Sequence, residues 1–197
     1  MKKLINLLMF CVISKLSLAQ NSNKYLQNAQ NELVNKNIEA AITSAQTAVR
    51  LDTLNDKAFS FLAKCFLITK EYNYSLLTIN KAIALRPSEE YFLLKANIDN
   101  ALSYHEEQVL DYIKALKLSE NTSTRYLKGV KLVSLKRFDD AIVDFQINIK
   151  NQKDSDRDYF GLFKCFLFKK DTVSALISIE EGIKNCTDPS DVGTLSF

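Results

Sequence analysis

The chain has 197 residues, of which 47% are hydrophobic and 25% charged, a composition typical of globular proteins. It contains only four glycines and two prolines, which favours long helices and argues against a fold rich in tight turns. The formal net charge is +3, but residues 1–19 hold Lys2, Lys3 and Lys15 and no acid, so the remainder has a charge of 3 − 3 = 0. Without a surplus of Lys and Arg, nucleic acid is not an expected partner.

Residues 1–19 have the pattern of an N-terminal signal peptide. A basic start is followed by a mostly apolar stretch over residues 4–13, and Ser17-Leu18-Ala19 supplies small residues for cleavage. We therefore expect cleavage near Ala19, a mature chain that begins at Gln20, and export to the periplasm, the cell surface or the medium.

Two alternatives concern the same segment. In an uncleaved anchor the apolar stretch would have to cross about 30 Å of hydrocarbon, but it is too short and Lys15 interrupts it. We expect no membrane span in the mature chain. Lipidation of Cys11 would require a small preceding residue, and Phe10 is bulky.

The rest of the chain repeats itself with steps of 34, 33, 33 and 34 residues. Four series of residues recur with these steps. In each unit the members of the last three series are four and three residues apart, which places them on one helical face. The members are, in order, the small residues Ala29, Ala63, Ala96 and Gly129 with the discordant Phe163; Ala41, Ser75, Gln108, Ala141 and Ala175; Ala45, Ile79, Tyr112, Phe145 and Ile179; and Ala48, Ala82, Ala115, Asn148 and Gly182.

With two helices in each unit, this pattern resembles the tetratricopeptide repeat. The second unit matches best, with Leu62, Ala63 and Phe66 on the first helix and Pro87 on the closing turn. Ser88 is expected to cap the next helix. The resemblance implies an all-α fold, a right-handed superhelical solenoid of about five helix-turn-helix repeats. A plain helical bundle is the alternative, but five units in one phase argue against it.

The expected organisation is a signal peptide over 1–19, a repeat array over 20–187 and a C-terminal tail over 188–197. The repeats span approximately 22–55, 56–89, 90–121, 122–155 and 156–187. A single hairpin cannot cover its apolar face, so each is expected to stack on its neighbour.

No group of residues predicts catalysis, a metal or a cofactor. His105 is the only histidine and is expected in a solvated turn, and a loop that starts at Asp154 lacks the glycine and glutamate that calcium requires. Asp156 and Asp158 are instead expected to cap and charge the following helix. The adjacent acids at 139–140 and 180–181 point about 100° apart on a helix and are interpreted as solvated.

The cysteines are interpreted as structural. Cys65 and Cys165 occupy equivalent positions of the second and fifth repeats and are expected to be small buried apolar residues, too far apart for a disulfide in one molecule. Cys186 is the best candidate for an exposed thiol.

In the family that the chain resembles, first helices line a concave face that holds a peptide or protein segment. Transferred to this sequence, the lining positions are Ser60, Lys64, Leu93, Asn97, Tyr126, Val130, Phe160 and Lys164. Packing between helices or plain exposure is the alternative for each. One subtype grips the terminal carboxylate of cytosolic chaperones; Lys64 and Asn97 would suit it, but other clamp positions do not match, namely Leu26, Gln30, Glu90 and Leu94.

The sequence therefore favours an exported, non-catalytic scaffold that binds a protein or peptide partner on its concave face, in a bacterial envelope assembly. A carbohydrate- or peptide-capturing component of nutrient uptake is one alternative. A homo-oligomer that forms through the last repeat is another, because Val192, Leu195 and Phe197 make the tail apolar.

Overall fold

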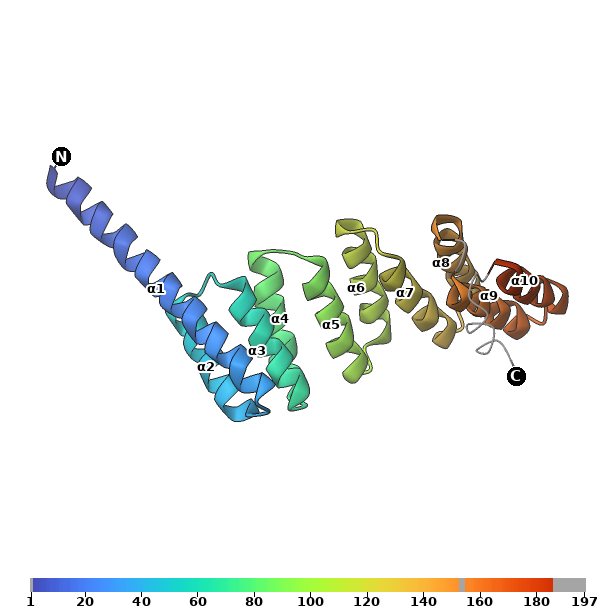
Figure 1. Ribbon diagram of the computed structural model, residues 1–197, viewed down its shortest axis with the longest axis horizontal. Coiled ribbons are helices and arrows are strands. Elements are labelled where there is room, and N and C mark those ends of the chain that lie inside the picture. The colour runs from blue at the N-terminus through green and yellow to red at the C-terminus, as the bar shows by residue number, and fades with distance from the viewer. Residues whose placement is uncertain (1, 153–154, 186–197) are drawn as a thin grey trace. The chain divides into compact units, whose positions relative to one another are not determined.

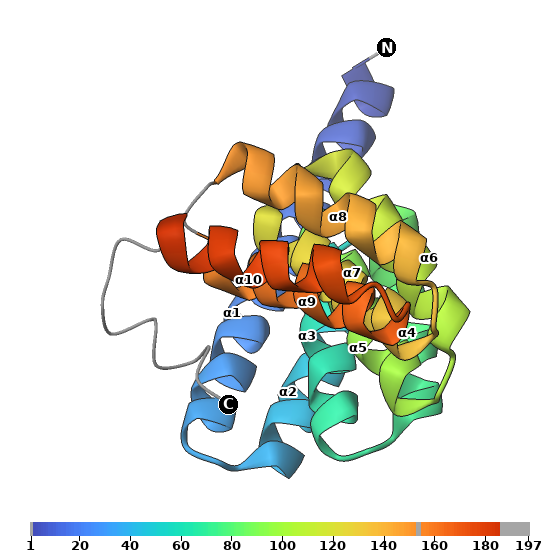
Figure 2. The ribbon, with the colours of Figure 1, turned by 90° about the vertical axis from the view of Figure 1, so that its right-hand side faces the viewer.

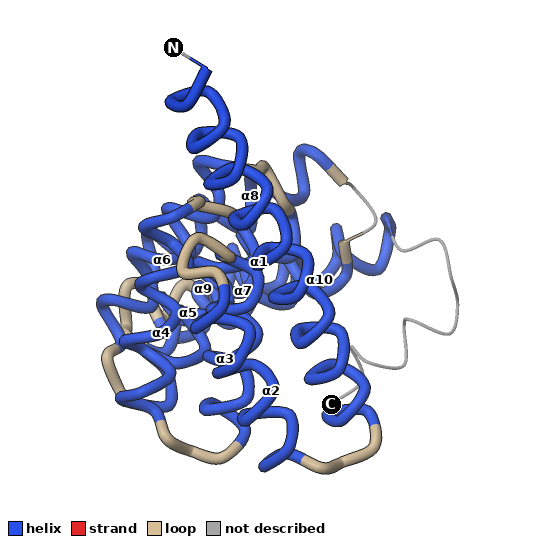
Figure 3. The backbone as a smooth tube through the Cα atoms, turned by 90° about the vertical axis from the view of Figure 1, so that its left-hand side faces the viewer, coloured by secondary structure: helices blue, strands red, loops and turns tan. Residues whose placement is uncertain are grey.

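The computed structural model describes residues 2–152 and 155–185, and within them the chain forms ten helices joined by short loops, with no strand (Figures 1 and 3). The chain divides into two compact units, Met1–Ser103 and Tyr104–Phe197. Cys186 and the tail over 188–197 lie outside the described residues, as does Asp154. The all-α prediction is confirmed.

The first unit contains five helices that pack in sequential order, each on the next. First helices also contact one another directly, α1 with α3 and α3 with α5, so they share one side of the unit. The helices are α1 (Lys2–Val34), α2 (Ile38–Leu51), α3 (Asp56–Ile68), α4 (Tyr72–Leu85) and α5 (Glu89–Ala101).

The second unit repeats this order, and Figure 2 shows it with α8, α9 and α10 nearest the viewer. Successive helices pack on each other, and the first helices α7 and α9 are again in direct contact. The helices are α6 (His105–Leu118), α7 (Thr122–Ser134), α8 (Phe138–Asn151), α9 (Asp156–Phe168) and α10 (Thr172–Asn185).

The periodic residues form the core of both units. Ala29, Ala63 and Ala96 are fully buried at the helix crossings, and the larger Ile79 and Phe145 are fully buried beside them. Small residues let helices approach closely, and the bulky series fills the space that remains. The prediction that these series lie on the packed face is confirmed.

The helix ends follow the local sequence signals only in part. The Ser88 side chain accepts a hydrogen bond from the Tyr91 amide at 3.2 Å, as predicted for the start of α5. The turn after each first helix contains a residue with φ between 60° and 64°, and none of these residues is glycine: Lys36, Lys70, Ser103, Lys136 and Lys170. The next amide reaches back to the helix, as from Glu71 to the Phe66 carbonyl at 2.8 Å, which closes the helix end.

Phe163 stands where the other repeats have a small residue, and the close approach of the helices is made at another residue instead. Phe163 is half-buried and stacks on Phe160 with ring centroids 5.9 Å apart. The close approach between α9 and α8 is made by Gly161, two positions earlier, against the ring of Phe145. The sequence pattern did not indicate this substitution because Gly161 lies outside the repeated phase.

Helix α1 continues without a break through the proposed cleavage site. Among the side chains of α1 that the structure describes, those in the hydrophobic clusters, Leu26 and Ala29, come after residue 19, while Met9, Ile13 and Leu16 are more than half exposed. None of the described helices has both the length and the apolar character needed to cross a bilayer.

Candidate partner-binding site

A groove of about 630 Å³ runs across the shared side of the first helices in the first unit. Every residue that lines it comes from α1, α3 or α5, and none comes from a second helix. It includes all four residues predicted for this unit, Ser60, Lys64, Leu93 and Asn97, so the fold brings them together. The full lining is Gln30, Leu33, Val34, Lys57, Ser60, Phe61, Lys64, Glu90, Tyr91, Leu93, Leu94 and Asn97.

The lining residues fall into levels, each made by residues that occupy the same repeat position on neighbouring first helices. Gln30, Lys64 and Asn97 are related by the steps of 34 and 33 residues and present amide and ammonium groups at one end. Lys57 and Glu90 are equivalent to each other, two helical turns earlier. The level between them holds Ser60 and Leu93 with the adjacent rings and aliphatic side chains. The groove therefore offers apolar contacts flanked by hydrogen-bonding and charged groups, which suits a peptide segment.

A buried hydrogen bond fixes one wall of the groove. Tyr91 is only 6% exposed, and its hydroxyl donates to Oδ2 of Asp56 at 2.7 Å, linking α5 to the start of α3. Burial, with the neighbouring Asp56 carboxylate second, raises the pKa of Tyr91. Arg86 Nε lies 3.9 Å from the same carboxylate oxygen. This wall is a structural link between repeats, since its polar atoms are already paired.

In the second unit, the four predicted residues lie on α7 and α9, and the two aromatic residues already have partners. Tyr126 packs on Phe145 with ring centroids 5.9 Å apart, and Arg157 lies 4.8 Å from the Tyr126 ring centre. Lys164 Nζ lies 4.4 Å from the ring centre of Phe160. Val130 is 44% exposed. Tyr126 is therefore partly used in packing between helices. Val130 is the predicted residue of α7 that is openly accessible.

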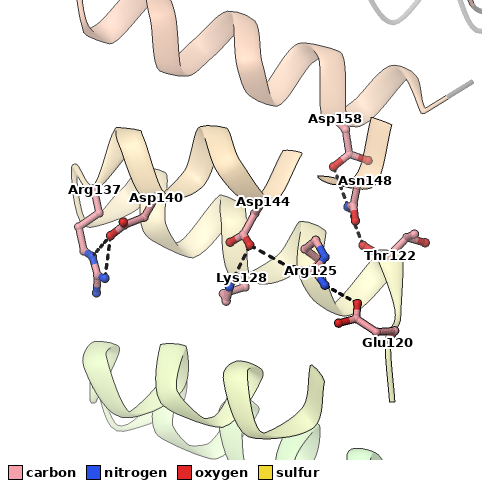
Figure 4. Close-up of polar contacts among 9 residues, drawn as sticks. All are labelled: Glu120, Thr122, Arg125, Lys128, Arg137, Asp140, Asp144, Asn148 and Asp158. Atoms are coloured by element: carbon pink, nitrogen blue, oxygen red, sulfur yellow. Dashed lines mark hydrogen bonds and ion pairs between the residues drawn. The ribbon is translucent and has the colours of Figure 1, made fainter. Parts of the chain in front are cut away.

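A buried network of charges joins the helices of the second unit (Figure 4). Asp144 on α8 is 3% exposed; Lys128 Nζ lies 2.9 Å and Arg125 Nη1 3.6 Å from its Oδ1 atom. Arg125 also pairs with Glu120. Burial raises the pKa of Asp144, and the two cations oppose that rise. These charges connect α7 to α8, and the second carboxylate oxygen of Asp144, Oδ2, is buried without a hydrogen-bond partner.

Asp158 lies in the first turn of α9, as predicted, but it makes no side-chain capping bond to that helix end and its carboxylate is fully buried. Oδ1 accepts from Asn148 Nδ2 at 2.9 Å, and the same amide nitrogen donates to the Thr122 carbonyl at 2.9 Å (Figure 4). Asp158 therefore connects α7, α8 and α9 and does not serve mainly to charge a helix end.

Other candidates for chemistry have structural surroundings. His105 is the first residue of α6 and not part of a turn, and its Nδ1 atom lies 2.7 Å from Lys131 Nζ. Cys65 and Cys165 are free and fully buried, as predicted, and burial raises the pKa of both thiols to about 11. Such thiols stay protonated near neutral pH and are poor nucleophiles. Among the residues that the structure describes, no group of three His, Cys, Asp or Glu side chains is arranged to hold a metal ion.

Sequence reasoning missed several lining residues, of which Lys57, Phe61 and Glu90 matter most. The available signal was periodic: Lys57 precedes Lys64 by seven residues, two helical turns, and therefore faces the same side. Glu90 was named only as a position that does not match the carboxylate-clamp pattern.

Sequential stacking of such hairpins defines a helical repeat protein, and comparison with solved structures shows that the fold is the tetratricopeptide repeat. A crystal structure of a MamA protein matches with a TM-score of 0.75 and 15% identity, over 84% of this chain and 92% of that one. YrrB, titled a TPR protein with an unusual peptide-binding site, matches with a TM-score of 0.70 and 16% identity over 87% and 89%. A tetratricopeptide repeat protein from Parabacteroides merdae ATCC 43184 gives 0.75 and 16% over 84% and 66%.

No protein-family model matches the sequence, and no curated protein matches it. At identities near 15%, the structural matches establish the fold, whereas partner and activity must be argued from this chain's own surface.

Proposed function

We propose that this chain is a non-catalytic scaffold that holds a protein or peptide segment against its first helices. The observation that carries the proposal is the groove of the first unit, which is lined by α1, α3 and α5 alone. The accessible Val130 and Lys164 extend the same role to the first helices of the second unit. That YrrB, a protein of the same fold, has a peptide-binding site is consistent with this role.

We further propose that the scaffold is exported and acts in a bacterial envelope assembly. The signal-peptide pattern of residues 1–19 supports export, and so does the distribution of contacts on α1. Ser22, Leu26 and Ala29 make buried contacts, whereas Ile13 and Leu16 are exposed, so cleavage after Ala19 would keep these buried contacts. Sequencing the N-terminus of the protein from fractionated cells is expected to give Gln20. A cytosolic protein that retains residues 1–19 would contradict export.

The binding role is tested by photocrosslinking from the groove. A benzoylphenylalanine at Leu93 is expected to capture a specific protein in envelope extracts, and one at Leu77, an exposed residue of α4 outside the groove, is expected not to. The variant Leu93→Glu is expected to release the same partner in a pull-down, with unchanged circular dichroism. Equal capture from both positions, or capture from neither, would contradict a role for the groove.

Self-association through the last repeat is a second candidate, supported by one observation. Ile142 and Ile149 of α8 pack against the cluster that contains α9 residues, but their equivalents Leu176 and Ile183 of α10 are 57% and 48% exposed. Light scattering on the mature protein is expected to show dimers or larger species if this face binds another copy. A monomer at all concentrations would exclude it.

A further inference from the structure

The α3 side of the groove carries a stripe of three polar groups. Lys57, Ser60 and Lys64 are spaced by three and four residues, so they lie along one face of the helix. The two lysines are about 10.5 Å apart along the axis, at 1.5 Å per residue. This spacing places two cations at the ends of a helical surface with a hydroxyl between them.

The Ser60 side chain lies in the groove lining, and its hydroxyl has no hydrogen-bond partner in the part of the chain that the structure describes. Ser60 is 7% exposed, and it lines the groove. Other hydroxyls within helices donate to the carbonyl four residues earlier, as Thr78 does to Tyr74 at 2.6 Å and Ser178 to Ser174 at 2.8 Å. Ser60 makes no such bond. The Oγ atom keeps access to the groove, so the hydroxyl can donate to a ligand atom there.

The two lysines are also unpaired, unlike Lys128 and Lys164 of the second unit. Neither Lys57 nor Lys64 has a carboxylate within ion-pair distance among the described residues, although both line the groove. Lys128 by contrast pairs with Asp144 at 2.9 Å, and Lys164 lies over the ring of Phe160. The unmatched positive charge at the groove therefore calls for an anionic partner.

The opposite side of the groove indicates what kind of molecule carries the anion. Phe61 and Leu93 provide apolar surface beside Ser60, and Asn97 presents an amide that can bond a peptide backbone. Glu90 is the one acid in the lining, and it is equivalent in position to Lys57. Two helical turns exceed the span of a single carboxylate, which argues against capture of one chain terminus.

We propose, building on the binding role above, that the groove takes an extended acidic segment of a partner protein. One carboxylate side chain lies at Lys57 and another at Lys64, the Ser60 hydroxyl donates to the segment between them, and an apolar side chain rests on Phe61 and Leu93. Charge complementarity and the two unpaired lysines select this partner over a neutral peptide.

The test compares matched pairs of short labelled peptides, acetylated and amidated so that no charged terminus remains. In each pair two glutamates flank a leucine, and the partner peptide has glutamines in their place. Binding is followed by the anisotropy of the label, because the chain contains no tryptophan. We expect the glutamate peptides to bind about tenfold more tightly, equivalent to about 1.4 kcal/mol, and to lose this advantage near 1 M salt, where the Debye length is about 3 Å.

Variants locate the effect on α3. Lys57→Gln with Lys64→Gln is expected to abolish the preference for glutamate, and Ser60→Ala to weaken glutamate binding severalfold, with circular dichroism unchanged. Lys150→Gln with Lys184→Gln removes the same charge from exposed helical positions of the second unit and is expected to leave the preference intact.

The outcomes separate this proposal from the binding role. If glutamine peptides bind as tightly as glutamate peptides and Leu93→Glu abolishes both, the groove binds peptides and the acidic preference is wrong. If no glutamate peptide binds while crosslinking from Leu93 still captures a partner, the acidic segment is likewise refuted and the groove retains its role. A phosphoserine peptide that binds while its glutamate counterpart does not would also refute the acidic segment, because the ligand would then be a phosphate.

Discussion

Phe145 allows a direct test of how the second unit is packed. Its ring is fully buried, and a methyl group added at either of two glycines on neighbouring helices would meet the edge of this ring, with Cε1 and Cζ common to both. A methyl group at Gly129 of α7 would lie 2.7 Å from Cε1 and 2.9 Å from Cζ, and one at Gly161 of α9 would lie 2.7 Å from both Cε2 and Cζ. Carbon atoms normally approach to about 3.5–4.0 Å. Contacts with both helices leave the ring little room to move away from an added methyl group.

We predict that Gly129→Ala lowers the free energy of unfolding when residue 145 is Phe and raises it when residue 145 is Leu. In the wild-type background, alanine gains about 1 kcal/mol of helix propensity but overpacks the core at a cost of about 1–3 kcal/mol, so we expect net destabilisation of about 1 kcal/mol. Phe145→Leu removes Cε1, Cε2 and Cζ, the atoms that obstruct the methyl group, and itself costs about 2 kcal/mol for three buried carbons at about 0.8 each. In that background Gly129→Ala is expected to stabilise by up to about 1 kcal/mol.

Urea denaturation followed by far-UV circular dichroism measures the four members of this cycle. Gly182→Ala is the matched control, because its added methyl group would contact Tyr159, with Cβ at 3.0 Å, and not Phe145. Its effect is expected to be the same in both backgrounds. If Gly129→Ala also has the same effect in both, the ring does not limit the approach of α7 and the packing described for Phe145 is wrong.

Three further predictions concern stability. Burial raises the pKa of the Cys65 thiol from 9.0 to about 11, so between these pH values the folded state keeps a proton that the unfolded state loses. The free energy of unfolding should therefore be unaffected below about pH 9 and fall toward pH 11 by up to about 1.4 kcal/mol per pH unit. Denaturation experiments should show a smaller slope for Cys65→Ala. Lys70→Gly, at a residue with φ of 64°, is expected to raise stability by about 0.5–1 kcal/mol in the same assay, and a loss would refute strain there. Asp144→Asn leaves two buried cations without their shared carboxylate and is expected to cost about 3 kcal/mol or more in thermal unfolding, whereas the exposed Asp140→Asn should cost less than about 1.

The sequence predicted the repeat and the packed face well because both depend on period. Small and bulky residues that recur every 33 or 34 positions can share one side of a hairpin only if the hairpins stack. The same logic placed Ser60, Lys64, Leu93 and Asn97 on first helices, and the structure gathers them in one groove. The sequence thus predicts where in its repeat a residue lies.

The sequence did not predict local departures from the repeat pattern. Gly161 replaces the small residue expected at 163 because a buried ring on α8 needs space two positions earlier. The burial of Asp144 depends on Lys128 and Arg125, whose approach is set by the packing of α7 on α8. Neither fact follows from residue type, since an aspartate on a helix is usually solvated.

The separation of core and binding positions explains why the fold alone does not identify the partner. Ala63 is fully buried and the next residue, Lys64, is exposed, because successive residues on a helix point about 100° apart. Ala96 and Asn97 repeat this arrangement on α5. The buried positions must stay small for the helices to stack, whereas the exposed ones can change without disturbing the stack. Proteins that share this fold at about 15% identity can therefore bind unrelated partners, and the unpaired lysines of α3 are a more specific guide to the partner than the repeat itself.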